Sequence, residues 1–237
     1  MLGPVMLGPE GMAALLLSLR VSIVAVLMSL PLAIAVAWIL ARHEFFGKAW
    51  LSALVHLPLV LPPVVTGYLL LIAFGRNGPI GAFIFEWFGI TLAFRWTGAA
   101  LAAAIMGFPL MVRAIRLAIE AVDPRLEEAA ATLGAPGWSI FARITLPLAL
   151  PGILAGVVMG FAKAMGEFGA TITFVANIPG ETQTLPSAIY ALLQIPGQEG
   201  PAATLVLWAL AISVLAVGIS EWLARRLAAR IGATHGV

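Results

Sequence analysis

Two ionisable residues interrupt an otherwise apolar part of the sequence. Lys163 and Glu167 are four residues apart, so one face of a helix would carry both. Charged groups inside a membrane usually face the bundle interior or water. Two interpretations stay open. The pair fixes the packing as an ion pair, or it belongs to a path in which the hydroxyls of Thr171 and Thr173 bond a passing oxyanion weakly.

No catalytic or metal-binding pattern accompanies this pair. The chain has no cysteine, and His43, His56 and His235 lack the spacing of metal ligands. It has no phosphate-binding loop either, because Gly47-Lys48 lacks the upstream glycine and is followed by alanine. We therefore expect a protein that is not an enzyme and holds no cofactor or metal of its own. Any ATP would be used by another polypeptide.

The composition places these residues in a membrane. The 237 residues are 62% hydrophobic and 10% charged, with a mean hydropathy of +1.05, whereas about a quarter of a soluble domain is charged. The net charge of +2 is too small to suggest nucleic acid. No basic residue precedes Arg20, and the first apolar run is too long for a removable signal peptide. These features predict an all-α polytopic membrane protein.

About five transmembrane helices are expected, since a helix needs about 20 apolar residues to cross the hydrocarbon. The uncharged runs of this length are Val21–Leu40, Ala49–Gly75, Trp96–Val112, Ile144–Ala162 and Pro201–Ser220. Two further apolar stretches are interrupted. Gly78–Phe94 is interpreted as a short outer-surface helix, and Thr182–Gln198 as a re-entrant or interfacial segment that could hide a sixth span. The expected division is a periplasmic tail (1–13), a transmembrane domain (14–224) and a cytoplasmic tail (225–237).

The basic residues predict the orientation, because Lys and Arg stay on the cytoplasmic side. Nine of the thirteen lie on one side of the five spans, and two, Arg76 and Arg95, on the other. The remaining two, Arg20 and Lys163, lie at or inside spans. Five spans then place the N-terminus outside and the C-terminus in the cytoplasm.

Small residues and prolines predict how two of the spans pack. Span four carries a stripe of small residues at every fourth position, which suits close helix contact within one subunit or with a second copy; its members are Gly152, Gly156, Gly160 and Ala164. Span two carries Pro58, Pro62, Pro63 and Gly67, which should kink or unwind it. Because broken helices are tolerated where they line a cavity or pack on protein, Pro62 and Pro63 are candidates for lining a translocation path.

The loop between spans three and four carries a docking pattern. Asp123 and Pro124 suit the start of a helix, and Gly134 suits its end. Such a helix would lie along the membrane surface, where small alanines could press into a partner's cleft. An amphipathic connector is the alternative. The pattern is completed at fixed spacing by Glu128, Ala129, Ala130, Gly134, Ile144, Leu146 and Pro147.

This spacing resembles the loop by which permease subunits of bacterial ABC importers seat on their ATPase subunits. Two further stretches, Gly166–Ala170 and Ser18–Ser22, resemble the oxyanion branch of these importers, and two more, His56–Val65 and Asn177–Thr182, resemble the molybdate permeases within it. The resemblance runs from about Ala14 to Arg226. It implies a type I importer fold and a bacterial inner-membrane location. Also implied are a permease homodimer, two ATPase subunits that bind ATP and Mg, and an external molybdate-binding protein.

Other functions remain open at this point. Within the same branch, a sulfate, thiosulfate or tungstate permease would share these features. An ion-coupled carrier or channel would need inverted repeats and a charged site at mid-membrane, and the sequence shows no internal repeat. A membrane-embedded enzyme would need a cluster of catalytic groups, which the sequence does not offer.

Overall fold

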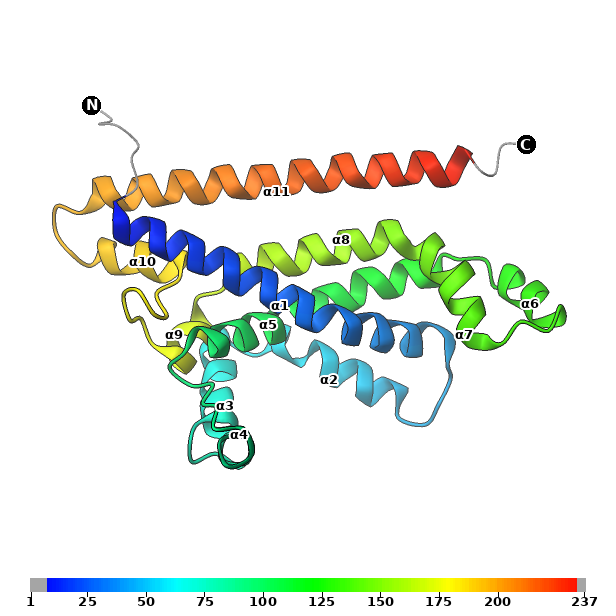
Figure 1. Cartoon of the computed structure of the whole chain (residues 1–237), viewed down its shortest axis with the longest axis horizontal. Helices are drawn as coiled ribbons and strands as arrows, with labels where there is room; N and C mark the ends of the chain where they lie inside the picture. Colours follow the sequence, from blue (N-terminus) through cyan, green and yellow to red (C-terminus); the bar gives the residue numbers. More distant parts are fainter. Residues whose placement is uncertain (1–7, 234–237) are drawn as a thin grey trace.

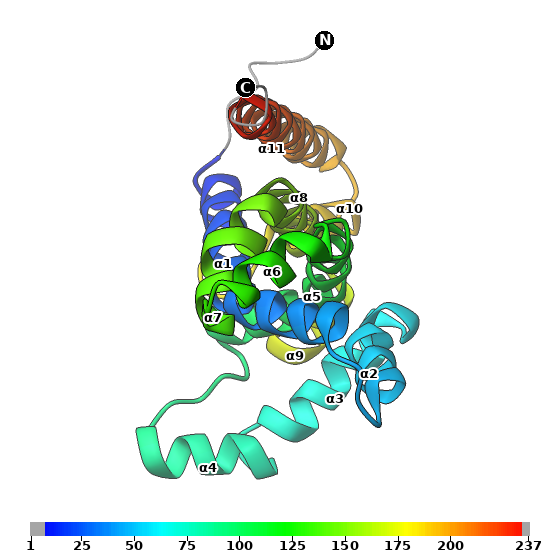
Figure 2. The same cartoon turned by 90° about the vertical axis from the view of Figure 1, so that its right-hand side faces the viewer.

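The protein is built from helices arranged around one central helix, α5. A computed structural model describes residues 8–233, which contain eleven α-helices, one π-helical turn and no strand. Helices α1 (Pro9–Arg42), α5 (Trp96–Glu120) and α8 (Leu146–Met165) pack side by side as the core of the bundle, and α11 (Glu199–Ala233) runs along one edge (Figures 1 and 2). The prediction of an all-α protein is confirmed for these residues.

The helices that are long and apolar enough to cross a membrane agree with the predicted spans in number and place. Four single helices of the described chain qualify, and a bent pair, α2 (Lys48–Val60) with α3 (Pro63–Phe74), makes a fifth if it is counted as one span. Their outer faces expose apolar side chains such as Leu27, Met28, Val214 and Leu215. Lipid tails are as apolar as leucine, so these exposed faces can contact the hydrocarbon of a membrane.

The lengths of the helices differ from the prediction. Helix α5 continues for eight residues beyond Val112, because a helix can extend past the bilayer into water once its polar residues begin. Helices α1 and α11 also run beyond their apolar cores, so residues 9–13 and 225–233 of the predicted tails are helical. Residues 1–7 and 234–237 of those tails lie outside the described chain.

The break predicted in span two is a sharp corner. The chain bends by 112° between α2 and α3, around Leu61 and Pro62, so the segment is not one straight span. Pro62 and Pro63 lack the N–H groups that would continue the helix, and a proline also disfavours helical geometry in the residue before it. After α3, the short α4 (Pro79–Phe88) confirms the predicted short helix, and both project from the bundle (Figure 2). Helix α10 (Leu185–Leu193) is too short to span.

The helix of span four begins earlier than predicted. The chain turns helical at α7 (Gly137–Ile140), passes through the π-turn η1 (Phe141–Thr145) and continues as α8, giving one helix of 29 residues. Pro147 does lie in the first turn of α8, but it is an interior residue of this longer helix. The π-turn explains why the helix does not start anew at Pro147. Its hydrogen bonds reach one residue further than those of an α-helix, and this change of pattern accommodates the N–H group that Pro147 lacks.

Close packing of α8 on α5 decides between the two interpretations of the small-residue stripe. A Cβ atom added at Gly152 would lie 2.1 Å from the Cβ of Ala118, and one at Gly160 would lie 2.6 Å from the Met111 side chain. Gly156 faces the same helix at Ile115. The stripe therefore serves contact within one subunit.

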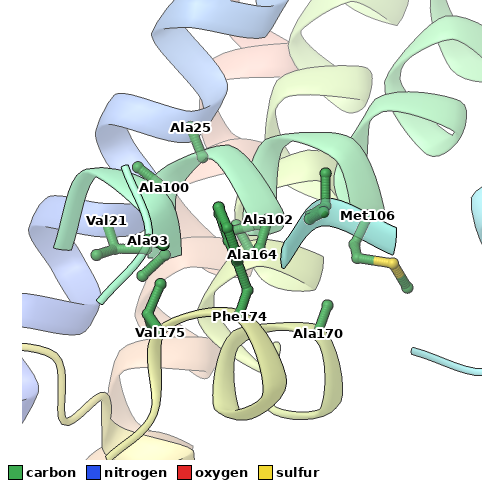
Figure 3. Close-up of a cluster of buried hydrophobic side chains, with 13 residues drawn as sticks. Val21, Ala25, Ala93, Ala100, Ala102, Met106, Ala164, Ala170, Phe174 and Val175 are labelled. Carbon is green, nitrogen blue, oxygen red and sulfur yellow. The ribbon is translucent and has the colours of Figure 1, made fainter. Parts of the chain in front are cut away.

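A core cluster of small side chains joins this helix pair to α9 (Gly169–Val175). Phe174 projects from α9 toward Ala102 of α5 and Ala164 of α8 (Figure 3). Alanines leave room for the aromatic ring, which is fully buried. This cluster holds α9 under the ends of α5 and α8, at the opposite end of the bundle from α6 (Pro124–Thr132) (Figure 1).

We expect Gly152→Val to destabilise the fold, because its side chain would overlap Ala118 on α5. The expected cost is about 1–3 kcal/mol, measured as a lower thermal midpoint of the detergent-purified protein. Gly218→Val on α11 is the matched control, since nothing lies within 4 Å of a Cβ added there. Equal midpoints for the two variants would contradict the close α5–α8 contact.

Candidate functional site

The predicted docking helix is present as α6, and local interactions explain both of its ends. Asp123 caps the N-terminus by accepting a hydrogen bond from the backbone N–H of Arg125 at 3.0 Å, and Pro124 occupies the first turn. At the C-terminus, the N–H of Gly134 donates to Ala131 O and that of Ala135 to Ala130 O. These two bonds form a Schellman motif, which the φ of +84° at Gly134 permits.

One face of α6 is apolar and has no cover in the described chain. Leu126, Ala129 and Leu133 recur at helical spacing and are all exposed, Leu133 by 89%. We call these three residues the docking stripe. Glu128 is exposed beside it, and Trp138 of α7 is 72% exposed nearby. A helix with free apolar side chains at the end of a bundle suits a partner's cleft.

The opposite face of α6 is attached to the rest of the molecule through Glu127. Its carboxylate pairs with Arg42 at the end of α1, with the Arg42 Nε 3.1 Å from Glu127 Oε2. It also accepts a hydrogen bond of 2.5 Å from the hydroxyl of Thr145. The sequence indicated only a favourable helix-dipole position for Glu127, because its partner on α1 is 85 residues away and leaves no local signal.

The downstream part of the motif anchors the helix that follows. Ile144 and Leu146 are half-buried, and Leu146 packs against the core cluster shared by α1, α5 and α8, whereas Pro147 is exposed. The structure thus divides the predicted motif into two parts. Glu128 and Ala129 are exposed, and Ile144 and Leu146 are half-buried against the bundle.

The second group of predicted residues surrounds the junction of α8 and α9. Lys163 Nζ lies 2.7 Å from Glu167 Oε2, so the predicted ion pair forms. The Glu167 side chain is only 1% exposed, while that of Lys163 is 29% exposed. Glu167 Oε1 also accepts a hydrogen bond from Ala170 N at 2.9 Å. The carboxylate thereby fixes the start of α9, and the residues around it shield it from solvent.

The hydroxyls expected near this pair are engaged in α9 itself. Thr171 is buried and donates to Phe168 O at 2.9 Å, and Thr173 donates to Gly169 O at 2.9 Å. Such bonds within one helix satisfy the hydroxyl protons locally. In this conformation Thr171 therefore has a packing role, and half-buried Thr173 keeps only acceptor capacity toward a neighbour.

Pro62 and Pro63 lie exposed at the corner between α2 and α3, beside the same junction. Two glycines allow α9 to lie close to this corner and to α3. A Cβ at Gly169 would lie 2.7 Å from Pro63 Cβ, and one at Gly67 would lie 2.9 Å from Thr173 Cβ. The structure thus brings Pro63 and Thr173 to one α3–α9 contact, directly after Glu167. Two of the six candidates for the path, Glu167 and Thr171, are buried.

The described residues contain no group of three or more His, Cys, Asp or Glu side chains placed to hold a metal ion. His56 Nδ1 lies 2.7 Å from Ser52 O on its own helix, as expected for a packed histidine.

Comparisons with known proteins agree with the resemblance that the docking pattern of the sequence indicated. The family model described as binding-protein-dependent transport system inner membrane component matches residues 20–229. The molybdenum transport system permease protein ModB of Escherichia coli K12 is 61% identical over 219 residues, covering 92% of this chain and 96% of that protein. The ModB of Haemophilus influenzae is 56% identical over 220 residues, covering 93% and 96%. A bacterial ABC transporter involved in the import of the acidic polysaccharide alginate has the same fold, with a TM-score of 0.73 at 19% identity, covering 92% and 80%.

We expect Lys163→Met to destabilise the protein, because Glu167 would stay buried without its counter-charge. Losing one partner of a buried ion pair costs about 3–5 kcal/mol. Adding Glu167→Gln should recover much of the thermal midpoint, since the amide oxygen can still accept from Ala170 N. Lys48→Met, which breaks the exposed pair with Glu44, should change stability by less than about 1 kcal/mol.

A different result would assign the pair to transport. If Lys163→Met is as stable as Lys48→Met and yet abolishes uptake, the charge of Lys163 serves the path and not the packing.

Proposed function

Because this chain belongs to the family of binding-protein-dependent transport system inner membrane components, we propose that it is the permease subunit of an ATP-driven molybdate importer. The resemblance seen in the sequence is confirmed by the family match over residues 20–229. The single observation that carries the substrate assignment is the 61% identity, over 92% of this chain, to a molybdenum transport permease. The chain is a transport subunit and not an enzyme, and ATP hydrolysis belongs to a separate ATPase.

The proposed complex contains two copies of this chain, two ATPase subunits and an external molybdate-binding protein. The solved alginate transporter has been crystallised with a periplasmic protein, which supports such a partner. A two-fold pair of permeases would place a path on their shared axis, where a bundle this small could not enclose one alone. ATP and Mg would be bound by the ATPase subunits.

The proposed orientation puts α6 in the cytoplasm. Helix α6 lies at the same end of the bundle as the last turn of α1 and the start of α2 (Figure 1), which carry Arg42 and Lys48. Basic residues favour the cytoplasmic side. The described chain starts at the opposite end and finishes at the α6 end, which supports an external N-terminus and a cytoplasmic C-terminus in the bacterial inner membrane.

The proposed mechanism is alternating access. ATP binding draws the two ATPases together, the docking stripes move with them, and the permease halves open toward the binding protein. Molybdate then passes along a path near Lys163, Thr173, Pro62 and Pro63, and hydrolysis restores the inward-facing state. The chain offers no arginine cluster that would grip an oxyanion tightly, which suits a path that must release its substrate.

Sulfate, thiosulfate and tungstate remain alternative substrates, since these anions resemble molybdate in shape and charge. Uptake of labelled molybdate by cells that express the importer should persist in excess sulfate. Full inhibition by sulfate would favour the sulfate permease instead.

The whole proposal is tested by copurification and hydrolysis. The chain should copurify with an ABC ATPase, and molybdate-loaded binding protein should stimulate ATP hydrolysis by the reconstituted complex. Uptake into vesicles by the chain alone, without ATP, would contradict the proposal and would favour an ion-coupled carrier or a channel.

We expect Gly134→Asp to abolish ATP-driven uptake while the protein still inserts. A residue with a Cβ adopts the φ of +84° less readily than glycine does, so the Schellman turn and the docking stripe next to it would shift. Uptake should fall by at least roughly tenfold, within the range of coupling effects. Gly47→Asp is the matched control, because Gly47 also has a positive φ, +95°, but caps α2 and lies outside α6. Normal uptake by Gly134→Asp would refute the docking role.

A further inference from the structure

One carboxylate joins three elements, of which α1 is 85 residues away in sequence. Arg42 at the end of α1 donates to Glu127 of α6, with its Nη2 3.1 Å from Oε1, and to Val122 O at 2.9 Å. Thr145, the last residue of the π-turn, donates to the same carboxylate. Glu127 therefore links α1, α6 and the start of α8 within one hydrogen-bonded network.

This network differs from the other ion pairs of the described chain. The pairs Glu44–Lys48, Arg116–Glu120 and Lys163–Glu167 each join residues four positions apart. Arg42–Glu127 is the one, among the described residues, that connects separate elements. Two guanidinium nitrogens contact the carboxylate, and such contacts fix orientation as well as distance.

The surroundings of the network permit a concerted shift. The π-turn Phe141–Thr145 replaces a regular helical turn, and such turns often mark functional sites. Beside it lies an open hollow of about 310 Å³, lined among others by Trp38, Glu128, Ala131 and Gly137. Helix α6 is thus held by a few polar contacts and not by a packed core. None of its residues is fully buried.

We propose that Glu127 is a positioning residue that transmits displacement of α6 to two membrane helices at once. The Arg42 contact moves α1, and the Thr145 contact moves the π-turn and, through it, α8. Helix α8 ends at the Lys163–Glu167 pair and α9, so a shift at its start reaches the candidate path at its far end. This inference rests on the proposed function, in which an ATPase moves the docking stripe.

The test uses Glu127→Gln in the full complex of permease, ATPase and binding protein. The ATPase should still copurify, because Leu126, Ala129 and Leu133 are unchanged and remain exposed. The number of molybdate ions transported per ATP hydrolysed should fall by about tenfold. Thr145→Val, which removes the hydroxyl at nearly constant shape, should lower the ratio by about fivefold.

A charge exchange and a matched control separate transmission from folding. The double variant Arg42→Glu with Glu127→Arg restores an ion pair between α1 and α6 and should recover most of the ratio. Glu120→Gln breaks the exposed pair with Arg116 on α5 and should leave the ratio at the wild-type value. If Glu127→Gln yields no folded protein, Thr145→Val decides the question in its place.

Two results would overturn the inference. In the first, Glu127→Gln transports as many ions per ATP as Glu120→Gln. In the second, Glu127→Gln loses the ATPase and the charge exchange does not restore it, which would make Glu127 a docking or folding residue. Failure of the proposed function is distinguishable, because the wild-type chain would then bind no ATPase.

Discussion

The close contact between α5 and α8 is the constraint on which the rest of the structure depends. Glycines at positions 152, 156 and 160 let the two helices approach to distances that a Cβ atom would prevent. Hydrocarbon offers no hydrophobic force to press helices together, so this intimate van der Waals packing must supply the association. Other helices then arrange around the pair, with α1 along one side and α9 beneath its end.

Through this contact α8 connects the two sites of interest. Its N-terminal end is tied to α6 by Thr145 and Glu127, and its C-terminal end carries Lys163, which pairs with Glu167 just beyond the helix. A helix is stiff along its axis, so movement at one end is felt at the other. Helix α8 therefore connects the candidate path at one end to α6, which carries the docking stripe, at the other.

Much of this arrangement was predictable because its causes are local. The cap at Asp123, the proline after it and the glycine at 134 determine α6 within a few residues, and its predicted bounds agree with the structure. Apolar runs of bilayer length gave the spans for the same reason. The spacing of Lys163 and Glu167 indicated an ion pair as one of two interpretations, and that pair forms although Glu167 lies just beyond the end of α8.

Features that depend on distant residues were not predictable. The role of Glu127 comes from Arg42, and the burial of Thr171 comes from the packing of α9 against α3 and α5. The 112° corner exceeded the predicted kink, because prolines permit a break but its angle is set by what α3 packs against. The start of the helix of span four at Gly137 was not predictable either, since a π-turn has no simple sequence pattern.

The most direct measurement asks on which side of the membrane α6 lies and what covers it. The natural chain has no cysteine, so Ala129→Cys places a single thiol on the docking stripe. A membrane-impermeant maleimide should label this thiol in inside-out vesicles stripped of ATPase and not in intact spheroplasts. Added ATPase should then protect it. Labelling from the external face would contradict a cytoplasmic helix driven by ATP.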